Sequence, residues 1–178
     1  MKLKRLIAWI LSLFKKPVSI IPPEPIRPPE PPKPISPNEK LYEYARTFLG
    51  KDASPKDVAT DEYGCAETIT NIIHGCFGDF PVEGGTIIST ITLFKKLKSH
   101  EKFELVTDFS YGDILVSPTG YGNGTIKNGH TGILGKNGLI MSNDSTTGLF
   151  KENYTIDKWV ERFREQGGFP LYFFRRIE

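Results

Sequence analysis

Cys65 and His130 are the two residues of this chain whose types and surroundings best suit covalent chemistry. Cys65 stands in Tyr63-Gly64-Cys65-Ala66-Glu67, where the pattern predicts the start of a helix. Backbone N–H groups and the positive end of the helix dipole favour a thiolate at such a position. His130 opens an apolar run about 65 residues later. An imidazole that the fold brings beside the thiol would complete a nucleophile–base pair.

The other two histidines are poorer partners for this thiol. His74 lies about two and a half turns along the helix predicted from Cys65, too far to touch it. His100 stands in a lysine-rich stretch where a helix is expected to end. His130 has glycine before it in an otherwise apolar strand, where a polar ring needs a reason. The alternative is that Cys65 is a buried structural thiol and His130 a core histidine with satisfied hydrogen bonds.

The elements that must position these residues change character near residue 100. Helices are predicted over 38–49, over 65–73 and over 89–98, the first capped by Asn38 and stopped by Gly50. Short β-rich runs then follow, with a last helix capped by Thr155 before the final run. These predicted strands are 103–106, 113–117, 129–134, 139–143 and 171–175. Helices first and an antiparallel sheet second predict an α+β fold.

Three motifs in this order resemble the papain-like NlpC/P60 and CHAP cell-wall hydrolases. They are the helix-borne Cys65, the strand motif Gly112-Asp113-Ile114-Leu115-Val116 and the later strand motif Gly129-His130-Thr131-Gly132-Ile133. The resemblance covers residues 38–178 and implies an N-terminal group of helices packed on an antiparallel sheet. It also implies a peptidase or amidase of peptidoglycan peptides, with Cys65 as nucleophile and His130 as general base.

By the same resemblance, a polar residue about a dozen positions after the histidine orients the imidazole, which points to residues 142–144. We favour Asn143, because an amide oxygen can accept from the imidazole N–H, and Asp144 comes second. Either residue could instead cap the turn at 145–148. The Cys65 N–H, with Tyr63 as a side-chain donor, is the candidate oxyanion site. Asp113 is expected to make a turn or strand-end contact.

Two segments precede the predicted domain. Residues 1–16 carry five basic and no acidic side chains around a nine-residue apolar run, which suits an interfacial membrane helix, an uncleaved export signal or a protein partner. Residues 17–37 contain ten of the fourteen prolines and predict a polyproline II spacer. A proline-recognising partner is the alternative for this spacer. We expect a location at a membrane, in the cell envelope or in a virion.

Composition and cysteine positions exclude several classes. The 178 residues allow one ordinary domain, and residues 38–178 carry 16 basic and 19 acidic side chains, a poor match to nucleic acid. Cys65 and Cys76 stand about 16 Å apart along one predicted helix, so we expect no disulfide between them. No Walker, dinucleotide or HExxH-type motif is present, so we expect no cofactor and no metal.

The sequence therefore predicts a small thiol-dependent peptidoglycan hydrolase on a membrane tether, with a stem peptide as its substrate. A phage lysin or virion-associated enzyme is favoured over a bacterial wall-remodelling enzyme, because no wall-binding repeat is visible. Endopeptidase and N-acetylmuramoyl-L-alanine amidase activities are not separated. The alternative is a structural or binding protein on a degenerate hydrolase fold.

Overall fold

The computed structural model describes residues 34–53, 64–80, 87 and 89–178. These residues belong to one compact unit, Pro34–Glu178, which begins four residues before the predicted domain boundary. The predicted membrane segment 1–16, most of the proline-rich spacer and Tyr63 lie outside the described residues.

Among the described residues, three helices precede the sheet. They are α2 (Pro37–Arg46), α3 (Cys65–Phe77) and α4 (Thr90–Ser99). The predicted cap of the first helix was wrong: Ser36 caps α2 by accepting a 3.1 Å hydrogen bond from the Glu39 N–H, and Asn38 lies inside the first turn. The α3 helix begins at Cys65 as predicted and continues past Gly75 to a left-handed cap at Gly78.

The sheet has six antiparallel strands in the order β1-β6-β2-β3-β4-β5, which confirms the α+β class. Five of its strands match predicted runs, with end points shifted by at most one residue. The sixth, β5, was missed, because the polar sequence Phe-Lys-Glu-Asn-Tyr-Thr shows no clear apolar alternation. The strands are β1 (Phe103–Val106), β2 (Ile114–Ser117), β3 (His130–Leu134), β4 (Leu139–Asn143), β5 (Phe150–Thr155) and β6 (Tyr172–Arg176).

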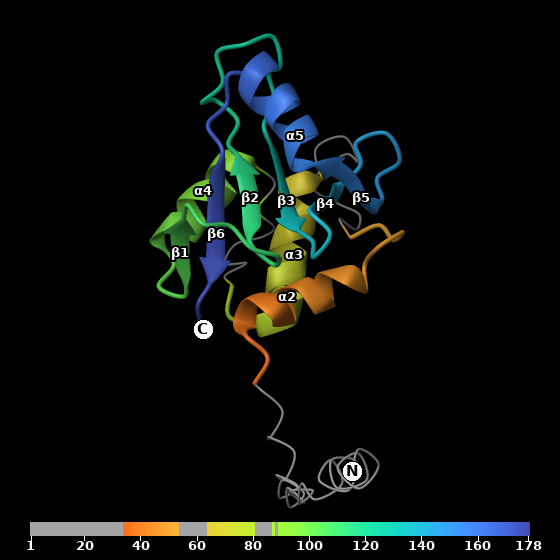
Figure 1. Cartoon of the computed structure of the whole chain (residues 1–178), viewed down its shortest axis with the longest axis vertical. Helices are drawn as coiled ribbons and strands as arrows, with labels where there is room; N and C mark the ends of the chain where they lie inside the picture. Colours follow the sequence, from red (N-terminus) through yellow and green to blue (C-terminus); the bar gives the residue numbers. More distant parts are fainter. Residues whose placement is uncertain (1–33, 54–63, 81–86, 88) are drawn as a thin grey trace, which may run out of the picture. The chain divides into compact units, whose positions relative to one another are not determined.

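Alternating side chains of the strands build one apolar cluster on each face of the sheet. Ile133 and Met141 join the cluster that includes residues of α2, α3 and α4. Their neighbours Leu134 and Ile140 join the second cluster, together with Trp159 and Phe163. Figure 1 shows the helical segment that begins with α5 near the start of β3. The sheet is therefore covered by helices on both faces.

The segment over the second face combines two kinds of helix. As predicted, Thr155 caps α5 (Ile156–Trp159) by accepting a 3.2 Å hydrogen bond from the Lys158 N–H. The chain then widens into the π-helix η1 (Val160–Gln166). Such π-helical turns are rare and often mark functional sites. This segment supplies aromatic side chains to the candidate site.

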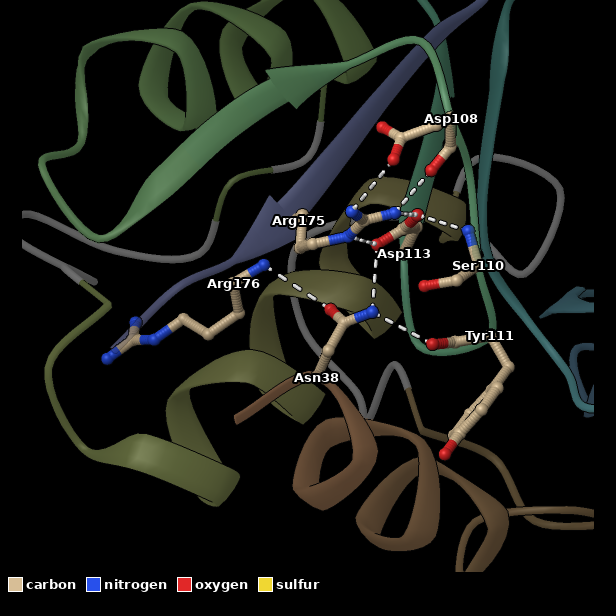
Figure 2. Close-up of polar contacts among 7 residues, drawn as sticks. All are labelled: Asn38, Asp108, Ser110, Tyr111, Asp113, Arg175 and Arg176. Atoms are coloured by element: carbon tan, nitrogen blue, oxygen red, sulfur yellow. Dashed lines mark hydrogen bonds and ion pairs between the residues drawn. The ribbon is translucent and has the colours of Figure 1, made fainter. Parts of the chain in front are cut away.

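A buried carboxylate joins the start of α2 to the sheet (Figure 2). Asp113 is fully buried and accepts hydrogen bonds from Asn38 Nδ2 at 2.8 Å and from the Ser110 N–H at 2.6 Å. Arg175 of β6 donates a hydrogen bond to each carboxylate oxygen of Asp113, from Nε at 3.1 Å and from Nη2 at 2.9 Å. This confirms the prediction of a turn and strand-end contact for Asp113. Gly112, at φ +86°, lets the Asn38 carbonyl approach so closely that no Cβ would fit.

Candidate active site

The Cys65 thiol lies at the N-terminus of α3, against the first peptide bonds of β3. The Ala66 and Cys65 N–H groups of the helix and the Thr131 N–H of the strand all lie within hydrogen-bonding reach of Sγ and lower its pKa. Burial has the larger effect, because the side chain is only 8% exposed, and it raises the pKa of Cys65 to about 11. The expected thiolate is therefore not the resting form of this group, which is a thiol at neutral pH.

His130, the first residue of β3, has its ring held by two polar side chains. Nε2 lies 3.0 Å from Ser142 Oγ of β4, and the Ser142 hydroxyl donates a 2.6 Å hydrogen bond to Asn153 Oδ1 of β5. Because the single hydroxyl proton of Ser142 points to Asn153, the serine oxygen accepts from Nε2–H. This relay sets the tautomer of the imidazole, with Nδ1 as the nitrogen that can accept a proton.

A β-bulge makes this relay possible. Ile140 pairs with Tyr154 and Met141 with Glu152, so Asn153 is an extra residue in β5. A bulge of this kind redirects a side chain relative to the regular alternation. The amide of Asn153 thereby reaches Ser142, which is fully buried. Ser142 lay within the window expected for the orienting residue, but Asn143 and Asp144 were preferred. Asn153 was missed, since neither the fifth strand nor its bulge has a signal in the sequence.

Aromatic rings enclose the imidazole. Trp159 and Phe163 stack on it with ring centroids 5.2 and 5.3 Å away, and Tyr154 meets it edge-on at 5.7 Å. Burial among these rings lowers the pKa of His130 to about 3, and the positive charge of Arg162 adds to the effect. His130 is consequently neutral at physiological pH and cannot be the charged partner of a resting thiolate.

The structure brings Cys65 and His130 to the same end of β3 without joining their side chains. The Thr131 N–H, which belongs to the peptide bond that follows His130, interacts with Sγ of Cys65. The imidazole lies on the other face of the sheet, against Trp159 and Phe163. Within the described residues no hydrogen bond connects Sγ to the ring. In this arrangement the thiol proton cannot pass directly to Nδ1, because the two side chains lie on opposite faces of the sheet.

The two candidates for the third position have different surroundings. Asn143 is 2% exposed and lines the same pocket as His130. Asp144 caps the following turn, because its Oδ1 accepts from the N–H groups of Thr146 and Thr147 at 3.0 and 2.9 Å. Its other oxygen lies 3.7 Å from Lys151 Nζ. The residue in contact with Nε2 is Ser142, directly before this pair.

The pocket beside His130 has a volume of about 190 Å³. Its lining residues include His130, Tyr154 and Arg162. Residues 126–129 of the loop before β3 form another part of the wall. The side-chain oxyanion donor predicted at Tyr63 lies outside the described residues.

Three further findings concern the cysteines, metal ligands and long apolar helices of the part of the chain that the structure describes. Both cysteines are free thiols there, as predicted. No group of three or more His, Cys, Asp and Glu side chains among the described residues could hold a metal ion. No helix in the described ranges is long and apolar enough to cross a membrane. Searches against protein-family models, curated proteins and solved structures give no significant match to this chain.

Proposed function

We propose that this chain is a thiol-dependent hydrolase of amide bonds in peptidoglycan stem peptides. The observation that carries the proposal is the placing of Cys65 at a helix N-terminus against the strand that begins with His130. Two further features support it: the Ser142–Asn153 relay fixes the imidazole tautomer, and a pocket opens beside the ring. The three sequence motifs and their order indicate the substrate class.

In the proposed reaction, His130 Nδ1 removes the thiol proton as Sγ attacks the carbonyl carbon of the scissile amide. The carbonyl electron pair moves onto oxygen, where the Cys65 N–H stabilises it, and then returns as the C–N bond breaks. The imidazolium gives its proton to the leaving amine. Water, deprotonated by His130, then cleaves the thioester and restores the thiol.

The pKa values do not allow a preformed ion pair at neutral pH. A thiol with a pKa of about 11 and an imidazole with a pKa of about 3 are both neutral at pH 7. The proton therefore moves during the attack, and substrate binding must bring Sγ and Nδ1 within reach of each other. The relay through Ser142 and Asn153 keeps Nε2 protonated while this happens.

Endopeptidase and N-acetylmuramoyl-L-alanine amidase activities both fit this scheme, since each breaks an amide bond. The basic apolar segment 1–16 and the proline-rich segment 17–37 suit an enzyme held at a membrane facing the cell wall. Their role as an interfacial anchor and spacer belongs to the same proposal, as does an origin in a phage or virion.

One observation favours a second candidate, a binding protein on a degenerate hydrolase fold. The Cys65 thiol is 8% exposed and makes no described hydrogen bond to an imidazole. The two candidates differ in the reaction that they predict, because a binding protein retains wall fragments without breaking amide bonds.

The test is the turbidity of a suspension of purified peptidoglycan mixed with the full chain in mild detergent. The proposal expects the suspension to clear, and Cys65→Ala to slow the clearing at least about 10³-fold, because members of a catalytic unit are lost together. Cys76→Ala is the matched control, since Cys76 lies in the last turn of the same helix. Equal clearing by the Cys65→Ala protein would refute the thiol mechanism. Co-sedimentation without clearing would favour the binding protein.

A further inference from the structure

Arg162 brings a positive charge to the pocket beside His130. The residue lies on the π-helix η1 and is exposed to solvent. Its guanidinium carbon lies 5.6 Å from the ring centroid of Phe163. None of the ion pairs in the described part of the chain includes Arg162. The five N–H donors of this side chain are therefore available to a ligand.

Lys127 adds a second cation to the same pocket, and no described acidic side chain lines it. Lys127 belongs to the loop before β3, and its Nζ lies 3.4 Å from the carbonyl oxygen of Gly124. Asp144 is close enough to affect the pKa of His130, but its carboxylate is held by the turn and by Lys151. The pocket therefore has a net positive wall, which suits an anion.

The π-helix η1 places Arg162 next to Phe163, the residue that stacks on His130. Phe163 is 4% exposed and stacks on the imidazole of His130. Arg162 is the preceding residue, so the packing of Phe163 fixes the backbone from which the guanidinium extends. Arg162 and His130 line the same pocket, so a ligand that Arg162 binds in this pocket lies next to His130.

We propose that Arg162, assisted by Lys127, binds a free carboxylate of the peptide substrate in the pocket beside His130. An arginine fork matches the two oxygens of a carboxylate. A volume of about 190 Å³ suits a single amino-acid residue better than a disaccharide. The inference rests on the proposed function and narrows its substrate class to stem peptides with a free carboxylate close to the scissile amide.

The test measures binding and not turnover. Two synthetic stem peptides, identical except that the α-carboxyl of the D-glutamyl residue is free in one and amidated in the other, are titrated into the full-chain Cys65→Ala protein by calorimetry. We expect the free carboxylate to bind at least about tenfold more tightly, in line with a hydrogen bond between charged groups. Arg162→Gln should remove this difference. Arg164→Gln, a matched change at an exposed residue of the same π-helix, should retain it.

The outcomes separate this inference from the proposed function. Equal affinity for both peptides, or a preference that survives Arg162→Gln, would overturn the carboxylate site, even if the protein with Cys65 cleaves both peptides. A preference that depends on Arg162 would support the site, even if neither peptide is cleaved by the protein with Cys65. If neither peptide is cleaved, the hydrolase proposal fails and the second candidate function, a binding protein on a degenerate hydrolase fold, is retained. Absence of binding to both peptides would overturn the carboxylate site.

Discussion

The reactivity of Cys65 as a function of pH tests the electrostatic description of the site. With a pKa of about 11, roughly one thiol in 10⁴ is ionised at pH 7, about 300-fold fewer than for an ordinary cysteine. Alkylation proceeds through the thiolate. The rate constant for iodoacetamide should therefore rise about tenfold per pH unit from pH 7 to pH 10, without a plateau.

The assay uses the full chain with Cys76→Ser, so that Cys65 is the only thiol, and follows the intact mass after each reaction time. The same protein in concentrated urea is the reference, because its unfolded thiol should level off near the ordinary pKa of about 8.5. The slope, not the absolute rate, is compared, since burial also slows access of the reagent. His130→Ala should leave the slope unchanged, because the resting imidazole does not ionise the thiol. A plateau between pH 5 and pH 8 that disappears in His130→Ala would refute this reasoning and show a thiolate–imidazolium pair.

Three further predictions follow from the same contacts. Ser142→Ala removes the acceptor for His130 Nε2–H. It should lower the turnover of a stem peptide about tenfold or more, since general-base catalysis contributes roughly 10²–10⁴-fold. Unchanged turnover would show that the relay does not orient the base. The pKa of His130 falls from 6.5 to about 3 on folding, so between these pH values the unfolded chain binds a proton that the folded chain does not. The free energy of unfolding should therefore fall by about 1.4 kcal/mol for each pH unit below pH 6.5, as far as about pH 3. Urea unfolding of the full chain and of His130→Gln measures this contribution as their difference in pH dependence, and parallel curves would contradict it. Asp113→Asn should lower the free energy of unfolding, measured in urea, by about 3–5 kcal/mol, because it breaks a buried ion pair with Arg175. Asp108→Asn, at a partner of the same arginine that is 85% exposed, should lower it by less than about 1 kcal/mol. Similar losses in the two variants would contradict the stabilising role of the buried Asp113.

The sequence predicted the elements with clear local signals. Helix α3 begins at Cys65 because a glycine precedes a run of helix-compatible residues with an apolar face. Strand β3 was visible from its β-branched and apolar residues. The predicted end of this helix at residue 73 was too early, because α3 continues to Phe77. In the structure Gly75 lies inside the helix and leaves room for the Tyr44 hydroxyl, which a Cβ would meet at 2.5 Å.

The surroundings of the site could not be predicted from local patterns. The imidazole partner Ser142 was within the expected window, but its selection depends on the register of β4 and on a bulge at Asn153. The stacking of Trp159 of α5 and Phe163 of the π-helix on His130 joins residues about 30 positions apart. Most importantly, burial of Cys65 outweighs its helix N-terminus, and burial depends on the whole tertiary structure.

The most direct test of the central claim identifies the chemical ends that the protein releases from peptidoglycan. The full chain, its Cys65→Ala variant and its Cys76→Ala variant are incubated with purified peptidoglycan, and the soluble products are sequenced by mass spectrometry. The account predicts new peptide ends or free lactyl groups from the full chain and from Cys76→Ala, but none from Cys65→Ala. The same new ends from all three proteins, or from none of them, would contradict the assignment of Cys65 as the nucleophile of a wall-peptide hydrolase.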